Sequence, residues 1–199
     1  MGYLKNKRTV CNMKRTKTFE LCLCALFAAL TAVCSQIAIP IKPVPINLAT
    51  FSVFFAGALL GPKLGAISQA VYVLMGAIGL PVFSSFRGGF AVLIGPTGGY
   101  IVGYILAAWL VGFLAKRGDH KIWVLILAMV AGFFAYMTTG TAWYMFCTKT
   151  ALVPSLMGCV IPFIPGDAAK MILATVLVRR LHPILDSKLQ KSSENTATV

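Results

Sequence analysis

The segment Ile164-Pro165-Gly166-Asp167-Ala168-Ala169-Lys170 places one carboxylate and one ammonium inside an apolar stretch that covers residues 151–178. The two charges are three positions apart, so on a helix they share a face. Each charge costs roughly 2.5–3.5 kcal/mol at the centre of a membrane-spanning helix. An ionisable pair at this depth therefore indicates a functional site, with Asp167 and Lys170 as its first candidate residues. The alternative interpretation is a structural ion pair that fixes helix packing.

The composition predicts an integral membrane protein built from helices. Of the 199 residues, 58% are hydrophobic and only 12% are charged, against about 25% charged in a soluble domain. Apolar runs that suit membrane helices follow one another with short breaks. We expect one all-α domain of six transmembrane helices over residues 19–181, between a basic cytoplasmic segment (1–18) and a cytoplasmic tail (182–199). The six expected spans cover residues 19–39, 48–60, 64–78, 95–115, 122–146 and 153–181.

The net charge of +13 does not indicate a nucleic-acid partner, because of where the basic residues lie. With both termini in the cytoplasm, fourteen of the 18 Lys and Arg residues fall on the cytoplasmic side. This asymmetry is typical of a multi-pass protein of the cell membrane. Anionic lipid headgroups are a sufficient partner for the excess positive charge.

Two loops on the predicted outer side are candidates for the walls of a pocket above the charged pair. Residues 40–47 contain three prolines and predict a stiff, extended loop. Residues 80–96 form an apolar loop rich in glycine, which at membrane depth must be buried in protein or line a cavity. The pocket is therefore expected to face outward.

Several residues near these loops could complete such a pocket. Aromatic walls are expected from Tyr72, Phe83, Phe86 and Phe90. An anion could be held by Arg87 and by the backbone N–H groups of Gly98 and Gly99 at the start of a helix. The expected ligand is a small molecule with paired N–H donors, an apolar body and a carboxylate.

The residues needed for catalysis are missing from the sequence pattern. Asp167 is the one acidic residue away from the ends of the predicted spans, so no carboxylate dyad can form there. No HExxH or P-loop pattern occurs, and the six cysteines include no CxxC. We expect no catalytic residue, metal or cofactor, and no enzyme, and we interpret the cysteines as small hydrophobic residues.

Three segments carry a resemblance to a known family: IKPVPINLATF (41–51), GLPVFSSFRGGFAVLIGPTGGYIVGY (79–104) and PGDAAK (165–170). They closely resemble BioY, the biotin-binding S component of energy-coupling factor (ECF) transporters. The resemblance implies a six-helix S-component fold that captures biotin from outside for ATP-driven uptake. It also implies a transmembrane coupling subunit and two ABC ATPases as partners.

The resemblance also implies roles for individual residues. Asp167 would accept hydrogen bonds from the ureido N–H groups of biotin, and Lys170 would neutralise Asp167 and donate to a ligand oxygen. Tyr72 and Asn47 are further expected biotin contacts. The small residues Ala25 and Ala29 of the first helix would dock on the coupling subunit. An S component for another vitamin, a membrane enzyme and a structural or assembly protein remain as alternatives.

Overall fold

The computed structural model describes residues 17–39, 44–118 and 121–197, with side chains for residues 18–39, 44–118 and 121–182. Most of the described chain is helical. The basic segment 1–16 and part of the proline loop, residues 40–43, lie outside the described residues. The elements in chain order are α1 (Lys17–Gln36), β1 (Ala38–Ile39), β2 (Ile46–Asn47), α2 (Ala49–Leu60), α3 (Pro62–Ala77), η1 (Ser84–Phe86), α4 (Phe90–Ile94), α5 (Gly98–Arg117), α6 (Ile122–Thr148), α7 (Leu152–Cys159) and α8 (Phe163–Ala197).

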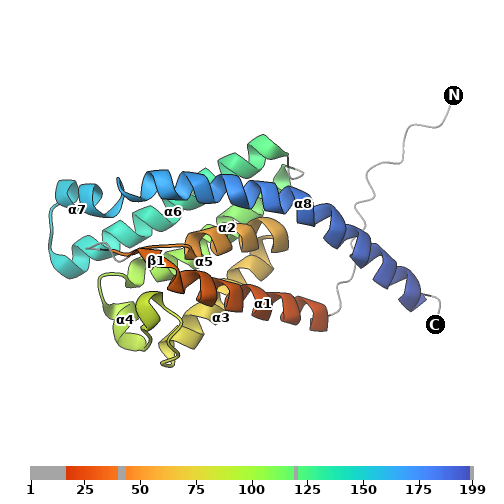
Figure 1. The fold of residues 1–199 in the computed structure, drawn as a ribbon, viewed down its shortest axis with the longest axis horizontal. Coiled ribbons are helices and arrows are strands. Elements are labelled where there is room, and N and C mark those ends of the chain that lie inside the picture. Colours follow the sequence, from red (N-terminus) through yellow and green to blue (C-terminus); the bar gives the residue numbers. More distant parts are fainter. Residues whose placement is uncertain (1–16, 40–43, 119–120, 198–199) are drawn as a thin grey trace.

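The long helices form one bundle around α2, and they run along the long axis of the molecule (Figure 1). All twelve residues of α2 are buried, because α1, α3, α5 and α8 pack around it. Such a helix needs no polar face, and its sequence is apolar on every side. Close packing depends on small residues: a Cβ on Gly57 would lie 2.5 Å from the carbonyl oxygen of Ala108 on α5.

Three of the described helices are long and apolar enough to cross a membrane by themselves. They are α1, α5 and α6. The pair α7 and α8 forms a fourth, broken span with a bend of 46°. The helices α2 and α3 have 12 and 16 residues, and at 1.5 Å per residue each is shorter than the ~30 Å hydrocarbon core. These four and the two short helices correspond in order to the six predicted spans.

The predicted end of the first span was wrong. The helix ends at Gln36 rather than near residue 39, and Ala38–Ile39 pairs antiparallel with Ile46–Asn47. The residue before a proline disfavours helical dihedrals, which explains why the chain becomes extended ahead of Pro40. The proline loop is thus closed at its base by a two-stranded ribbon, fixed further by the Leu48 N–H, which donates to the carbonyl oxygen of Ile37 (3.0 Å).

The predicted last span, expected to be kinked or interrupted by prolines, is two helices. The chain leaves the helix after Cys159 and resumes it at Phe163, immediately after Pro162. A proline has no N–H for the preceding turn and is favoured near the start of a helix. In the other direction α8 passes residue 182 without a break and continues to Ala197, so the tail that we separated from the membrane domain extends the same helix.

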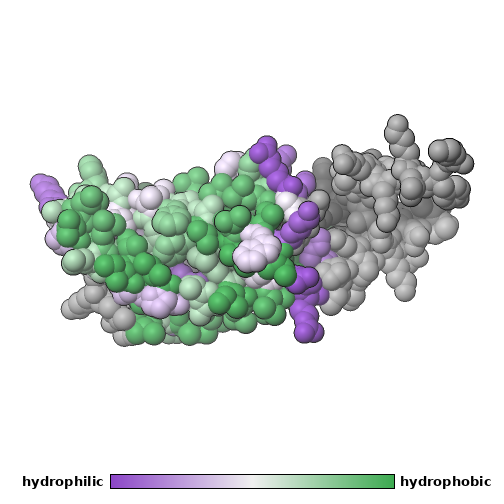
Figure 2. Space-filling model, turned by 90° about the horizontal axis from the view of Figure 1, so that it is seen from above, coloured by the Kyte–Doolittle hydropathy of each residue, from purple (hydrophilic) through white to green (hydrophobic). Residues whose placement is uncertain are grey.

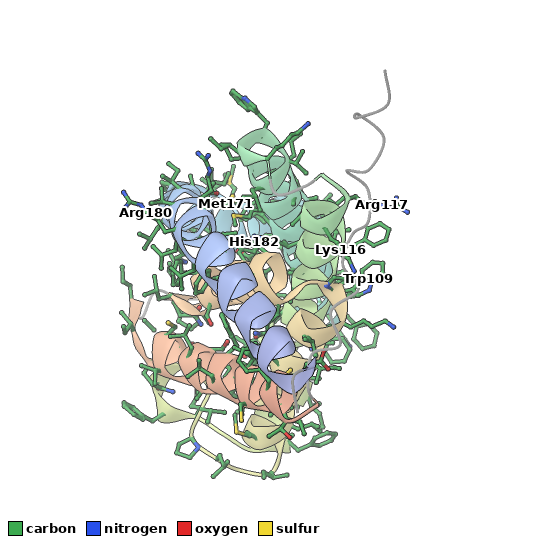
Figure 3. The ribbon with its side chains drawn as sticks, turned by 90° about the vertical axis from the view of Figure 1, so that its right-hand side faces the viewer. Trp109, Lys116, Arg117, Met171, Arg180 and His182 are labelled. Carbon is green, nitrogen blue, oxygen red and sulfur yellow. The ribbon has the colours of Figure 1, made fainter. Side chains whose placement is uncertain are left out.

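The two ends of the bundle differ in structure and in charge. The ribbon β1–β2, α4 and α7 gather at one end, whereas α1 begins and α8 terminates at the other (Figure 1). Apolar residues cover most of the described surface seen in Figure 2, and polar residues collect at its right-hand end, where α8 leaves the bundle. Viewed from that end, Arg117 of α5 and Arg180 of α8 project from opposite sides of the bundle (Figure 3). We refer to the end with the ribbon as the loop end and to the other as the basic end.

Candidate binding site

The two charges of the segment 164–170 form an ion pair inside the bundle. Asp167 and Lys170 lie on the same face of α8, with the Lys170 Nζ atom 2.7 Å from Asp167 Oδ1. Asp167 is fully buried and Lys170 is 8% exposed. Neither side chain faces lipid. At such burial a charge is tolerated only when its hydrogen-bonding capacity is met by partners.

Partners from three other elements meet that requirement. Asp167 Oδ1 accepts a hydrogen bond from the hydroxyl of Thr50 on α2 (3.0 Å), and Oδ2 accepts one from the hydroxyl of Tyr136 on α6. Lys170 Nζ also donates to the carbonyl oxygen of Asn47 (2.6 Å) and to Thr50 Oγ1 (3.1 Å). The pair therefore joins α8 to α2, to α6 and to strand β2.

Asn47 connects this network to the loop end. Its Oδ1 atom accepts the backbone N–H of Ala49 (3.2 Å) at the start of α2, where helix N–H groups have no partner within the helix. Its Nδ2 atom donates to the hydroxyl of Ser84 in η1 (2.6 Å). One residue thus bonds α8 through its carbonyl, α2 through its side-chain oxygen and η1 through its amide nitrogen.

A small cavity of about 30 Å³ lies beside the network at the loop end. Three of its lining residues, Asn47, Thr50 and Tyr136, contact the ion pair directly, while Asp167 and Lys170 themselves do not line it. Its volume is far below the roughly 300–1,000 Å³ of typical small-molecule sites. The walls come from the proline loop, α2, α3, η1, α4, α5, α6 and α8. The lining residues are Val44, Pro45, Asn47, Thr50, Tyr72, Phe83, Ser84, Arg87, Val92, Thr97, Tyr100, Ile101, Tyr104, Tyr136 and Phe163.

Four of the predicted ligand residues line this cavity: Asn47, Tyr72, Phe83 and Arg87. The rings of Tyr72 and Phe83 meet edge to face with centroids 5.6 Å apart, and the Tyr72 hydroxyl donates to the carbonyl oxygen of Val82 (3.3 Å). Arg87 is exposed, and its Nε atom donates to the carbonyl oxygen of Ser84 (3.2 Å). Its guanidinium therefore stands at the rim of the cavity, where its other N–H groups have no hydrogen-bond partner among the described residues.

The structure does not bring the other predicted wall residues to the cavity. Gly98 and Gly99 are not among its lining residues, and the Gly98 N–H donates to the carbonyl oxygen of Gly95 (3.0 Å). Both glycines serve packing instead, since a Cβ on Gly99 would clash with Trp143 of α6. Phe86 and Phe90 are 72% and 64% exposed, because they lie on the outer side of η1 and α4.

Sequence reasoning missed the hydroxyl-bearing residues of the site. Thr50 and Tyr136 were not selected, nor were Tyr100 and Tyr104, which lie one helical turn apart on α5 and both line the cavity. A usable signal was present for the tyrosines: a buried Tyr hydroxyl needs a hydrogen-bond partner, and three of the six tyrosines fall in the two apolar runs 95–115 and 122–146 away from their ends.

The sequence model of the BioY family matches residues 7–187 of the chain. The chain belongs to the BioY family. It is 40% identical over 165 residues to the biotin transporter BioY of Thermotoga maritima, an alignment that covers 83% of this chain and 96% of that relative. It is 39% identical over 166 residues to the probable biotin transporter BioY of Pyrococcus horikoshii, which covers 83% of this chain and 98% of that one.

A solved structure of the family has the same fold. The crystal structure of the S-component for biotin from an ECF-type ABC transporter matches with a TM-score of 0.78 and 34% sequence identity, over 84% of this chain and 92% of that chain. The match confirms the predicted all-α S-component fold and the assignment of the chain as a membrane protein. The BioY relatives are named as transporters, in line with the expectation of a binding protein rather than an enzyme.

Proposed function

We propose that this BioY protein is the substrate-binding subunit that captures biotin from outside the cell for uptake by an ATP-driven ECF transporter. The observation that supports it most strongly is a fully paired ion network buried beside a cavity at the loop end. The names of the BioY relatives support biotin as the ligand.

Within this proposal, the residues around the cavity match the parts of biotin. Asp167 accepts the ureido N–H groups once Thr50 or Tyr136 releases an oxygen of its carboxylate. Lys170 neutralises the carboxylate and donates to a ligand oxygen. Tyr72 and Phe83 contact the apolar body, Asn47 offers an amide, and Arg87 at the rim binds the valerate carboxylate.

The accessible space of about 30 Å³ is far below that of small-molecule sites, roughly 300–1,000 Å³, so capture requires the walls to move apart. The described walls outside the α-helices include Val44 and Pro45 at the end of the proline loop and Ser84 of η1. Both are joined to the ion pair through Asn47. Ligand entry is therefore proposed to open the loop end and to exchange protein hydrogen bonds for ligand hydrogen bonds.

The proposed orientation places the loop end outside and both termini in the cytoplasm. It is supported by the basic residues that are exposed at the basic end, among them Lys63, Lys116, Arg117, Arg179 and Arg180. The chain then crosses the cell membrane six times, with cytoplasmic segments at residues 1–18 and 182–199, and its basic end contacts anionic lipid.

The proposed partners are the transmembrane coupling subunit and two ABC ATPases. Ala25 and Ala29 are exposed and lie one turn apart on the outward side of α1, where small residues let a second helix approach closely. No segment of the protein is a candidate for ATP binding, so the energy for uptake comes from the partners.

Calorimetric titration of the purified chain with biotin tests the proposal, with riboflavin and thiamine as competing vitamins. We expect tight binding of biotin alone, and at least a tenfold loss of affinity in Asp167→Asn, equal to about 1.4 kcal/mol. Binding of a different vitamin would favour another S-component specificity. A chain with no ligand-dependent rise in melting temperature would favour the structural alternative, and conversion of the ligand would favour an enzyme.

A further inference from the structure

A second hollow of the bundle is unrelated to the ion network. It is a groove of about 290 Å³ between α6 and α7, lined on the α6 side from Phe133 to Met145 and on the α7 side by Leu152, Leu156 and Val160. Its surface is almost wholly apolar. The two threonines that line it, Thr138 and Thr141, have their hydroxyls bonded to backbone carbonyls of α6 and to the Tyr100 hydroxyl, respectively.

From this groove we infer a binding site for one phospholipid of the outer leaflet, with an acyl chain between α6 and α7. The groove opens toward the membrane, because Phe134, Leu152 and Leu156 on its rim are 60%, 55% and 39% exposed. Its length also fits: the twelve positions from Phe133 to Met145 span about 18 Å, close to the ~15 Å depth of one leaflet.

The mouth of the groove carries the charge that a phosphate needs. Lys149 is the residue that caps the C-terminal end of α6. It lies four positions after Met145 and three before Leu152, and both Met145 and Leu152 line the groove. Its side chain is exposed and, within the described part of the chain, it forms no ion pair with a carboxylate. Its left-handed backbone (φ 53°) and the bond from its N–H to the carbonyl oxygen of Met145 (2.9 Å) fix its position at the helix end.

Hydroxyl groups hold the two helices together at the same mouth. Thr150 Oγ1 lies 2.8 Å from Thr148 Oγ1 and 2.9 Å from Ser155 Oγ, which joins the end of α6 to the start of α7. Thr148 and Ser155 donate their own protons to backbone carbonyls, so the donor for a headgroup is the ammonium of Lys149. A cation above an apolar slot matches two parts of a phospholipid, the phosphate and an acyl chain. A peptide helix would be a poorer fit, because one wall of the groove is a helix of only 8 residues.

The site is tested with the full chain reconstituted in vesicles of equimolar phosphatidylcholine and phosphatidylglycerol, extracted in detergent and weighed intact by native mass spectrometry. Ala142→Trp fills the groove, since Ala142 lines it and is exposed. Leu127→Trp is the matched control, because Leu127 is 65% exposed on α6 but does not line the groove. Helical content and a monodisperse elution profile establish that each variant is folded.

We expect one retained phospholipid per chain in the native protein and in Leu127→Trp, and a loss of at least fivefold in Ala142→Trp. Lys149→Gln should still retain a lipid, but its ratio of bound phosphatidylglycerol to bound phosphatidylcholine should be about fivefold lower than in the native protein. This is the effect expected of one basic residue at a membrane surface. Should Ala142→Trp fail to fold, the native protein is compared before and after delipidation, and added phosphatidylglycerol must raise its melting temperature. The inference is overturned if Ala142→Trp and Leu127→Trp retain phospholipid equally. It is also overturned if the native chain carries bound detergent but no phospholipid. None of these measurements depends on biotin.

Discussion

Removing the ammonium of the buried pair separates the stability of the fold from ligand binding. In Lys170→Met the Asp167 carboxylate stays buried but loses its ion-pair partner, and the carbonyl oxygen of Asn47 loses a donor at 2.6 Å. Breaking a buried ion pair by removing one partner costs about 3–5 kcal/mol. For a chain of this size we expect the melting temperature to fall by roughly 6–20 °C.

The double variant Asp167→Asn/Lys170→Met removes both charges and leaves no uncompensated ion. The Asn amide oxygen can accept from one of the two hydroxyls, Thr50 or Tyr136, and its NH2 group can donate to the oxygen of the other. The Met side chain fills the space of the lysine stem. We therefore expect at least half of the lost stability to return. Biotin affinity should not return, because the double variant has neither the carboxylate acceptor nor the ammonium donor. Both the single and the double variant should bind biotin at least tenfold more weakly than the native chain.

Stability is measured from the intrinsic fluorescence of the detergent-solubilised protein on heating without biotin, and affinity by calorimetry below the melting temperature. Lys63→Met is the matched control: Lys63 is exposed at the basic end, so stability should change by no more than about 0.5 kcal/mol. A double variant that binds biotin as the native chain does would show that the pair only holds helices together. A single variant as stable as the native chain would refute the account of charge compensation.

Three further predictions concern individual side chains. Tyr136→Phe removes the donor to Asp167 Oδ2 and should cost about 1.5–3 kcal/mol of stability in the same heating assay. The control is Phe134→Leu, at an exposed position of α6. Equal melting temperatures for the two variants would contradict the hydrogen bond. Arg87→Gln should weaken biotin binding roughly fivefold at most, as expected of an exposed charge. In calorimetry the affinity for a biotin amide, which has no carboxylate, should not change. An equal loss of affinity for both ligands would argue against contact between Arg87 and the carboxylate. Ala25→Trp should keep biotin binding but lose co-purification with the coupling subunit, whereas Ile172→Trp on the exposed side of α8 should keep both; assembly of the Ala25 variant would place the docking surface elsewhere.

The apolar runs predicted the bundle well, because membrane helices leave a direct trace in composition. The starts of α2, α3 and α6 lie within two residues of the expected positions. The errors occur where the chain is not apolar and regular. Two short strands ahead of and behind the prolines depend on pairing across the loop, and the left-handed residues Ser85 and Phe86 (φ 63° and 54°) form a turn that no propensity favours.

The candidate site could be located from the sequence but not completed. A carboxylate and an ammonium in an apolar run are rare enough to select Asp167 and Lys170. Hydroxyl groups in apolar helices are common, and only the tertiary fold selects Thr50 and Tyr136, which lie 117 and 31 positions from Asp167. The glycines of α5 suggested an anion site, but backbone N–H groups can bind a ligand only if the fold leaves them without a partner, and at Gly98 it does not.

The uninterrupted length of α8 has a mechanical consequence. The helix carries the ion pair near its first residues and continues for 27 positions beyond Lys170, about 40 Å at helical rise. Because Asn47 ties Lys170 to η1 through Ser84, a displacement of the loop end acts on one end of this helix. A tilt of a few degrees there moves the opposite end by several ångströms, so the state of the cavity can be sensed at the basic end without a change in the fold.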